Sequence, residues 1–99
     1  MTAANSAPPT IDIQHQAERQ RFVAAVDGAE GVLGYHNEGR LMVISHTDVP
    51  AAIGGRGIAG QLVQAALEHA RSEGWTVRPD CSYAAAWVKR HPEYASLLG

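Results

Sequence analysis

The sequence predicts a single α+β domain in which helices pack on a mostly antiparallel β-sheet. Short segments that alternate apolar and polar residues, separated by glycine-containing turns, fill the first half of the chain. An apolar pattern of helical period follows from Gly57 to Glu73, and a further strand-like segment and a second helical segment come after it. The expected order of elements is therefore β-β-β-β-α-β-α.

Four segments in the first half are expected to be strands, and the short turns between them favour antiparallel neighbours. These segments cover residues 11–14, 21–26, 32–36 and 41–46. Gly28 and Gly31 mark a turn in the stretch DGAEG, and residues 37–40 supply a second turn with the residue types of a β-hairpin. Alternation in the last strand places Leu41, Val43 and Ser45 on one face, and Met42, Ile44 and His46 on the other.

The predicted helix links the fourth strand to a fifth at residues 76–78, and Gly74 supplies the residue type favoured just after a helix. Because a helix of this length makes a crossover connection, the fourth and fifth strands are expected to run parallel. A second helix is expected to run to Arg90, with Asp80 or Ser82 as its N-terminal cap.

Size and composition exclude several classes of protein. The chain has 99 residues, enough for one domain, with residues 1–10 expected as a flexible tail and residues 11–99 as the folded unit. The net charge is −2 and no basic cluster occurs, which argues against a nucleic-acid surface. No apolar run approaches the roughly 20 residues of a membrane helix, so no membrane association is expected. With one cysteine, no internal disulfide and no signal-peptide pattern, we expect a cytoplasmic monomer or weak homodimer.

The stretch GGRGIAGQL, residues 54–62, is a glycine-rich loop that leads into the first predicted helix. Such loops bind phosphate, because the first N–H groups of a helix lack partners inside it and glycine lets a phosphate approach the backbone. Residues 55–60 also match the dinucleotide fingerprint G-x-G-x-x-G, with Asp80 after the next strand. Residues 46–53 separate the loop from its strand, however, and an antiparallel start does not fit a doubly wound sheet. A turn that only begins the helix is the other alternative.

The same loop resembles motif A of the GCN5-related N-acetyltransferases (GNAT), in which Q/R-x-x-G-x-G/A begins a helix after a long strand. Gly57 and Ala59 match its two small positions, whereas Gly54 replaces the glutamine or arginine. Further segments resemble the smallest members of this family. In chain order, the matching segments are His46-Thr47-Asp48-Val49-Pro50, Gly55-Arg56-Gly57-Ile58-Ala59, Cys81-Ser82-Tyr83 and His91-Pro92-Glu93-Tyr94.

The resemblance spans residues 11–98 and implies a GNAT-like sheet, acetyl-coenzyme A (acetyl-CoA) as the cofactor and an amine as acceptor. It implies that the pyrophosphate of coenzyme A lies on Gly54, Gly55, Arg56, Gly57, Ile58, Ala59 and Gly60. Arg56 would add a charge-assisted contact. The pantetheine arm would lie along the edge from His46 to Val49, which includes Thr47, and backbone N–H groups near Val49 would polarise the thioester carbonyl.

Removal of a proton from the amine can be assigned to His46 or Asp48. These residues lie two apart on an extended segment and can therefore share a face. The ordinary pKa of histidine, about 6.5, suits a general base. The alternative is a solvent-exposed histidine at a strand end and an aspartate that caps the turn.

Cys81 follows the fifth strand at the expected start of the second helix, a position that lowers the pKa of a thiol. It can be a nucleophile that forms an acetyl-cysteine, or it can lie beside the coenzyme thiol without covalent chemistry. The alternative is a buried apolar side chain. Tyr83 lies near the place where many family members carry a tyrosine that protonates the leaving thiolate. A core tyrosine with its hydroxyl at the surface is the alternative for Tyr83.

The five histidines form no recognisable ligand set with Cys81, so no metal site is expected. The favoured function is therefore an acetyl-CoA-dependent N-acetyltransferase. A non-catalytic acyl-CoA-binding or interaction module on the same fold is the alternative, because a chain this short leaves little to build an acceptor pocket. Nothing in the sequence selects the amine acceptor.

Overall fold

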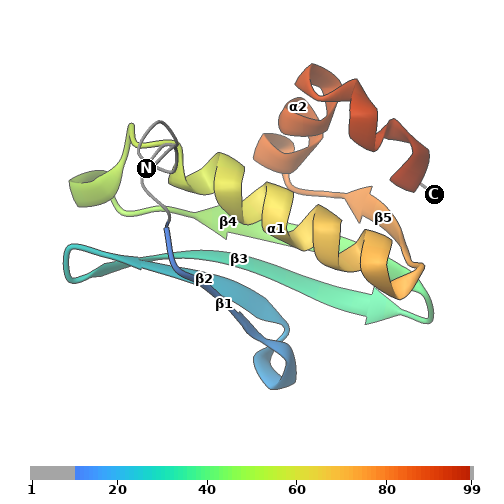
Figure 1. Cartoon of the computed structure of the whole chain (residues 1–99), viewed down its shortest axis with the longest axis horizontal. Coiled ribbons are helices and arrows are strands. Elements are labelled where there is room, and N and C mark those ends of the chain that lie inside the picture. Colours follow the sequence, from blue (N-terminus) through green and yellow to red (C-terminus); the bar gives the residue numbers. More distant parts are fainter. Residues whose placement is uncertain (1–10, 99) are drawn as a thin grey trace, which may run out of the picture.

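The structure, a computed structural model, describes residues 11–98, and the tail predicted at residues 1–10 lies outside the described part. Five strands form one sheet: β1 (Ile13–Gln16), β2 (Arg21–Val26), β3 (Ala29–Glu38), β4 (Leu41–Asp48) and β5 (Thr76–Pro79). The α-helices are α1 (Ile58–Glu73) and α2 (Ser82–Arg90). The 3₁₀ segments are η2 (Ala17–Arg19), η3 (Ala51–Ile53) and η4 (Pro92–Leu97). Figure 1 shows α1 lying along the sheet, with α2 and the C-terminal segment beyond it.

The strands lie side by side in chain order, β1-β2-β3-β4-β5. The first four pair antiparallel, and β4 pairs with β5 in parallel across the α1 crossover. The predicted α+β architecture, with its one parallel pair, is confirmed. A parallel bridge between Val77 and Leu98 also places the end of the described chain along the outer edge of β5.

The turn between β2 and β3 is tighter than the sequence predicts. Asp27 and Gly28 form it with φ of 50° and 79°, the left-handed conformations that a two-residue hairpin turn requires. The prediction that Gly31 belongs to this turn is wrong, because Gly31 lies in β3, buried beneath α1. A Cβ on Gly31 would lie 3.1 Å from Ile58 Cγ2 and 3.3 Å from Val49 Cγ2. Glycine at this position lets the start of α1 approach the sheet closely.

The hydrophobic core lies between the sheet and α1. Phe22, Leu33 and Ile44 point from β2, β3 and β4 into this core. The buried side of α1 consists of Ile58, Leu62, Val63, Ala66, Leu67 and Ala70. Each fully buried leucine of this kind contributes roughly 1.5–3 kcal/mol to folding. The helix is flanked by Gly57 and Gly74, which both adopt left-handed φ, and this confirms the predicted boundaries.

The C-terminal segment is fastened to α1 by Tyr94. Its hydroxyl donates to Glu68 Oε2 at 2.6 Å, and the Arg71 guanidinium carbon lies 4.9 Å from the centre of its ring. Burial, with the hydrogen bond to the Glu68 carboxylate, raises the pKa of Tyr94 above its ordinary value. The H-P-x-Y segment therefore ends α2 and docks η4 on the first helix.

Candidate active site

The strands β4 and β5 separate where their parallel pairing ends. The last pair joins Ile44 to Pro79, and β4 continues beyond it. After β5, the N–H groups of Asp80 and Cys81 both donate to the Ile44 carbonyl at 3.0 Å, which turns the chain toward α2. Residues 45–48 therefore have an edge that is not paired with β5, and an extended ligand can add to such an edge. We call this point, between residues 45–48 and the turn at Asp80 and Cys81, the β4–β5 fork.

A β-bulge in β4 determines the face of the sheet on which each side chain near the fork lies. The pairing of β3 with β4 shifts between Gly34 and Tyr35, since Tyr35 pairs with Ile44 whereas Gly34 pairs with His46. Ser45 is the extra residue in β4, and its hydroxyl donates to the Gly34 carbonyl at 3.1 Å. Side chains along a strand alternate between the two faces of the sheet. One inserted residue therefore reverses this alternation after Ser45.

The reversal sends His46 to the face of the sheet that is turned away from α1, here called the far face. The sequence places His46 on the face of Met42 and Ile44, and this prediction is wrong because of the bulge. The His46 ring lies directly over Gly34, where a Cβ would overlap it. Asp48 lies two residues further along the same face, as the sequence predicts, and both side chains are exposed.

Thr47 points to the helix side of the sheet and meets Cys81. The Thr47 Oγ1 and Cys81 Sγ atoms lie 3.6 Å apart, a hydrogen-bond distance for sulfur. Cys81 is half-buried and occupies the N-cap position of α2. The prediction that Asp80 or Ser82 caps this helix is therefore wrong, since the Asp80 carboxylate binds Arg78 at 3.0 Å and Ser82 already belongs to the helix.

The surroundings of the Cys81 thiol favour its deprotonated form. Burial by itself raises the pKa of Cys81, but surrounding donors outweigh burial and bring this pKa below its ordinary value. The donors are the backbone N–H of Ala84, the Thr47 hydroxyl, and the backbone N–H groups of Tyr83 and Thr47. The sulfur makes no side-chain capping hydrogen bond to α2, but it lies at the N-terminus of this helix, where the helix dipole also favours a thiolate. A thiol with a lowered pKa at a helix N-terminus is a favourable nucleophile.

The glycine loop between η3 and α1 is open on its outer side. Gly55 and Gly57 both have φ of 76°, and nothing lies within 4 Å of the position of a Cβ on either. The Gln61 N–H donates to the Gly57 carbonyl at 3.1 Å, so the N–H groups of residues 58–60 precede the first hydrogen bond inside α1. Left-handed glycines before unpaired helix N–H groups fit a phosphate or pyrophosphate.

Arg56 is paired with an acidic residue rather than pointing into an empty loop. Its Nη1 lies 2.5 Å from Asp27 Oδ2 in the turn between β2 and β3. The side chains of Arg56 and Asp27 are 48% and 68% exposed, so the pair contributes only about 0–1 kcal/mol to stability. A phosphate on the loop would compete with Asp27 for this guanidinium.

Tyr83 lies on the first turn of α2 and is 36% exposed. Its hydroxyl points to Gly60, where a Cβ would lie 3.4 Å away. The structure therefore brings Tyr83 to the end of the predicted phosphate loop, while Thr47 and Cys81 lie together at the fork.

Comparison with known proteins agrees with this geometry. Residues 21–97 match the family described as GCN5-related N-acetyl-transferases. The chain belongs to this family. The resemblance carried by four short sequence segments is thereby confirmed, and the GNAT family is one of acetyltransferases.

Relatives of similar length support the assignment to the GNAT family. Protein NATD1 of Mus musculus is 33% identical over 99 residues, which cover 90% of this chain and 90% of the relative. Protein NATD1 of Gallus gallus is 35% identical over 85 residues, which cover 83% of this chain and 77% of the relative. A GCN5-like protein from Staphylococcus aureus, solved by NMR, superposes with a TM-score of 0.72 at 24% identity, over 90% of this chain and 88% of its own. At that identity, the match to the solved structure supports the fold alone.

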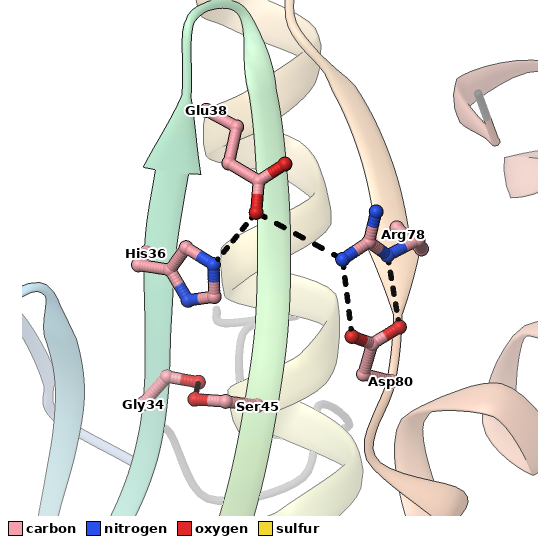
Figure 2. A network of polar contacts seen from close by, with 6 residues as sticks. All are labelled: Gly34, His36, Glu38, Ser45, Arg78 and Asp80. Carbon is pink, nitrogen blue, oxygen red and sulfur yellow. Dashed lines mark hydrogen bonds and ion pairs between the residues drawn. The ribbon is translucent and has the colours of Figure 1, made fainter.

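The far face of this GNAT domain carries a charged network beside the fork (Figure 2). His36 Nε2 lies 3.1 Å from Glu38 Oε2, and Arg78 Nη2 lies 3.9 Å from the same oxygen. Arg78 Nε also donates to Asp80 Oδ1 at 3.0 Å. In Figure 2 this network crosses β3, β4 and β5 with α1 behind the strands. The network holds Asp80 in place immediately before Cys81, and its exposed ion pairs add little stability.

Within residues 11–98, no three histidine, cysteine, aspartate or glutamate side chains gather closely enough to hold a metal ion. None of the helices in this range is long and apolar enough to cross a membrane. Sequence reasoning missed the bulge and the Asp27–Arg56 pair. Ser45, His46 and Thr47 are all polar, so the apolar pattern carries no sign of the inserted residue.

Proposed function

We propose that this protein transfers the acetyl group of acetyl-CoA to an amine at the β4–β5 fork. The contact between Thr47 and Cys81 carries the proposal, because it sets a thiol of lowered pKa beside an unpaired strand edge. That edge is connected through residues 49–53, which include η3, to the glycine loop at the start of α1. The residues fit the coenzyme, since the loop leaves room for a pyrophosphate and the edge of residues 45–48 can pair with the amides of pantetheine.

Cys81 performs the first step. Its thiolate attacks the carbonyl carbon of the thioester, a new S–C bond forms, and the bond to the coenzyme sulfur breaks. The coenzyme leaves as a thiolate and takes a proton from water, so the acetyl group now rests on Cys81. Acetyl-CoA supplies the activated acyl group, whereas the protein supplies the thiolate and the N–H dipoles of α2 that stabilise negative charge.

His46 serves the second step from the far face through a bridging water molecule at the fork, because the Cys81 thiol lies with Thr47 on the helix side. It accepts a proton from the ammonium form of the acceptor, and the neutral amine nitrogen attacks the acetyl carbon on Cys81. As the C–S bond breaks and the amide forms, the nitrogen gives its second proton to the departing Cys81 sulfur. The Cys81 thiol then loses this proton to water and returns to the thiolate, while His46 releases its own proton to solvent. Asp48, exposed on the same face, is the second candidate for the base.

Ligand-induced stabilisation and turnover test this function. Millimolar coenzyme A or acetyl-CoA should raise the melting temperature, because both bind only the folded protein. Arg56→Gln should reduce that shift, whereas Arg40→Gln, an exposed arginine in the turn between β3 and β4, should leave it unchanged. Release of coenzyme A thiol in the presence of an amine panel measures turnover. No thermal shift with either ligand contradicts the proposal, and binding without turnover on any amine favours the non-catalytic acyl-CoA-binding module.

A further inference from the structure

Two hydrogen-bond donors from α2 converge on the first turn of α1. Tyr83 and Trp87 lie one helical turn apart on the same side of α2, and both point to Gly60. A Cβ on Gly60 would lie 3.0 Å from the indole Nε1 of Trp87 and 3.4 Å from the hydroxyl of Tyr83. The two polar atoms are therefore neighbours above a single residue of the glycine loop.

The indole of Trp87 is held firmly in this orientation. Its ring stacks on His91, with 3.7 Å between ring centres and 13° between planes, and lies tilted against Tyr94 at 5.5 Å. His91 Nδ1 also donates to the Trp87 carbonyl at 2.8 Å. The H-P-x-Y segment thus fixes Trp87 with the N–H edge of its indole toward α1.

Trp87 as a whole is only 6% exposed, and no side-chain hydrogen bond joins its indole N–H to another residue of the described chain. The one buried side-chain polar atom without a partner in residues 11–98 is Asn37 Nδ2, so the indole Nε1 keeps access to solvent. An indole N–H that is held in place and open to solvent is free to donate to a ligand that binds beside it. Close packing of α1 on α2 explains why residue 60 is a glycine. The Tyr83 hydroxyl can donate as well as accept, so it and the indole N–H can both donate to a ligand at this point.

The groups around this point define the ligand chemistry. The backbone N–H groups of residues 58–60 lie in the same turn and precede the first hydrogen bond inside α1. The indole and backbone N–H groups here are donors only, and the Tyr83 hydroxyl can also donate, beside the positive end of a helix dipole. An acceptor-only, negatively charged group satisfies them, and phosphate is such a group.

We propose that the Tyr83 hydroxyl and the Trp87 indole N–H donate to a phosphate oxygen of coenzyme A on the first turn of α1. This inference rests on the proposed function, because it takes coenzyme A as the ligand. It makes Tyr83 a coenzyme-binding residue and removes it from the protonation of the leaving thiolate. It also gives the H-P-x-Y segment a role in binding, since that segment positions Trp87.

The indole N–H signals of ¹⁵N-labelled protein test the inference directly. The chain has two tryptophans, so Trp75 serves as an internal control for Trp87. Coenzyme A should shift the Trp87 indole N–H signal together with the amide signals of Gly57 and Ala59, and should leave the Trp75 signal in place. Pantetheine, which lacks phosphate, should leave the Trp87 signal unchanged.

Two results of this titration overturn the inference and leave the proposed function intact. In the first, coenzyme A moves the loop amides but not the Trp87 indole signal. In the second, pantetheine moves that indole signal as far as coenzyme A does. If coenzyme A moves no signal at all, the proposed function fails, and this inference fails with it.

Variants provide a second test that a purely structural role would not pass. Tyr83→Phe and Trp87→Phe should each weaken coenzyme A binding about tenfold and leave pantetheine binding unchanged. Trp75→Phe removes an indole N–H just before β5, away from the glycine loop, and it should leave both affinities unchanged. Because Tyr83 is partly exposed, Tyr83→Phe tests the inference even if Trp87→Phe does not fold. Wild-type affinity in Tyr83→Phe, or equal losses for coenzyme A and pantetheine, overturns it.

Discussion

The sulfur of Cys81 lies 3.6 Å from the hydroxyl oxygen of Thr47, at the point where β4 and β5 separate. A thiol donates to this oxygen, whereas a thiolate accepts from the hydroxyl, so the contact persists in both states. The thiolate gains more, because a hydrogen bond to a charged acceptor is stronger than one to a neutral acceptor. The bulge at Ser45 turns Thr47 toward the sulfur. The reactivity of Cys81 therefore depends on the register of β4.

Thr47→Val should raise the pKa of Cys81, since it removes a hydroxyl that stabilises the thiolate. The rate of alkylation by iodoacetamide, measured against pH, follows the fraction of thiolate. The wild-type midpoint should lie below the ordinary thiol pKa, and the Thr47→Val midpoint should lie above that of the wild type. Thr76→Val, at the exposed start of β5, is the matched control and should keep the wild-type midpoint. Identical profiles for all three proteins would show that Thr47 has no influence on the thiol.

Asp27→Asn should strengthen binding of coenzyme A. This change removes the carboxylate that holds Arg56 in the unliganded protein. The guanidinium can then bind the phosphates without first breaking an ion pair. Exposed pairs contribute about 0.2–1 kcal/mol, which corresponds to a roughly 1.4- to fivefold lower Kd. Calorimetric titration measures this affinity.

The control for Asp27→Asn removes the same charge elsewhere. Asp12→Asn changes an exposed carboxylate just before β1 and should alter Kd less than Asp27→Asn does. If both variants gain equally, general electrostatic attraction explains the effect and the Asp27–Arg56 pair does not compete with the coenzyme.

Gly34→Ala should displace His46 from the far face. A methyl group on Gly34 would overlap the imidazole, and the ring is exposed and able to move, so the loss of stability should be small, within about 1 kcal/mol. Turnover should fall to the level of His46→Gln, while the Kd for coenzyme A stays at its wild-type value. Full activity in Gly34→Ala would mean that proton transfer does not depend on the position of His46 over Gly34. Unchanged turnover in His46→Gln would then leave Asp48 as the base.

Much of this fold could be predicted from the sequence because its elements have regular periods. The segment at 21–26 and the helix between Gly57 and Gly74 follow their apolar patterns closely, and the order of elements then requires the parallel crossover. The first strand lies at Ile13–Gln16 instead of residues 11–14, since a short polar segment at a sheet edge carries a weak pattern.

The candidate site was less predictable, because it depends on contacts between distant segments. The sequence motifs pointed to Thr47, Cys81 and the loop glycines as candidates. They did not indicate on which face of the sheet each side chain lies. The bulge at Ser45 and the approach of Trp87 to Gly60 are properties of packing between elements. A glycine inside a helix, as at position 60, was the signal for that close approach, since glycine there disfavours the helix by roughly 0.5–1 kcal/mol relative to alanine.

Acid should destabilise the fold through His15. This ring is stacked on Phe22 at 4.2 Å, lies 4.3 Å from His69 and bonds through Nε2 to the Tyr35 hydroxyl at 2.5 Å. Burial first, and then the neighbouring His69, lower the pKa of His15, while Glu73 partly opposes them. The unfolded chain therefore binds a proton at His15 more readily than the folded one. The stability from His15 is complete above its unfolded pKa of about 6.5 and falls as pH drops below that value.

Urea unfolding at pH 7.5 and pH 5.5 measures this effect, with His15→Phe as the comparison. Phenylalanine keeps the stacking on Phe22 but cannot take a proton, so the variant should lose less unfolding free energy between the two pH values than the wild type does. An equal loss in both proteins would assign the acid sensitivity to other groups.

Intact-mass analysis after a brief incubation with acetyl-CoA tests the central claim most directly. The account predicts a mass increase of one acetyl group, carried by Cys81, absent from Cys81→Ser and removed when a suitable amine is added. Acid quenching before analysis preserves the thioester. A protein that gains no acetyl group, together with unchanged turnover in Cys81→Ser, would contradict acetyl transfer through the thiol at the β4–β5 fork.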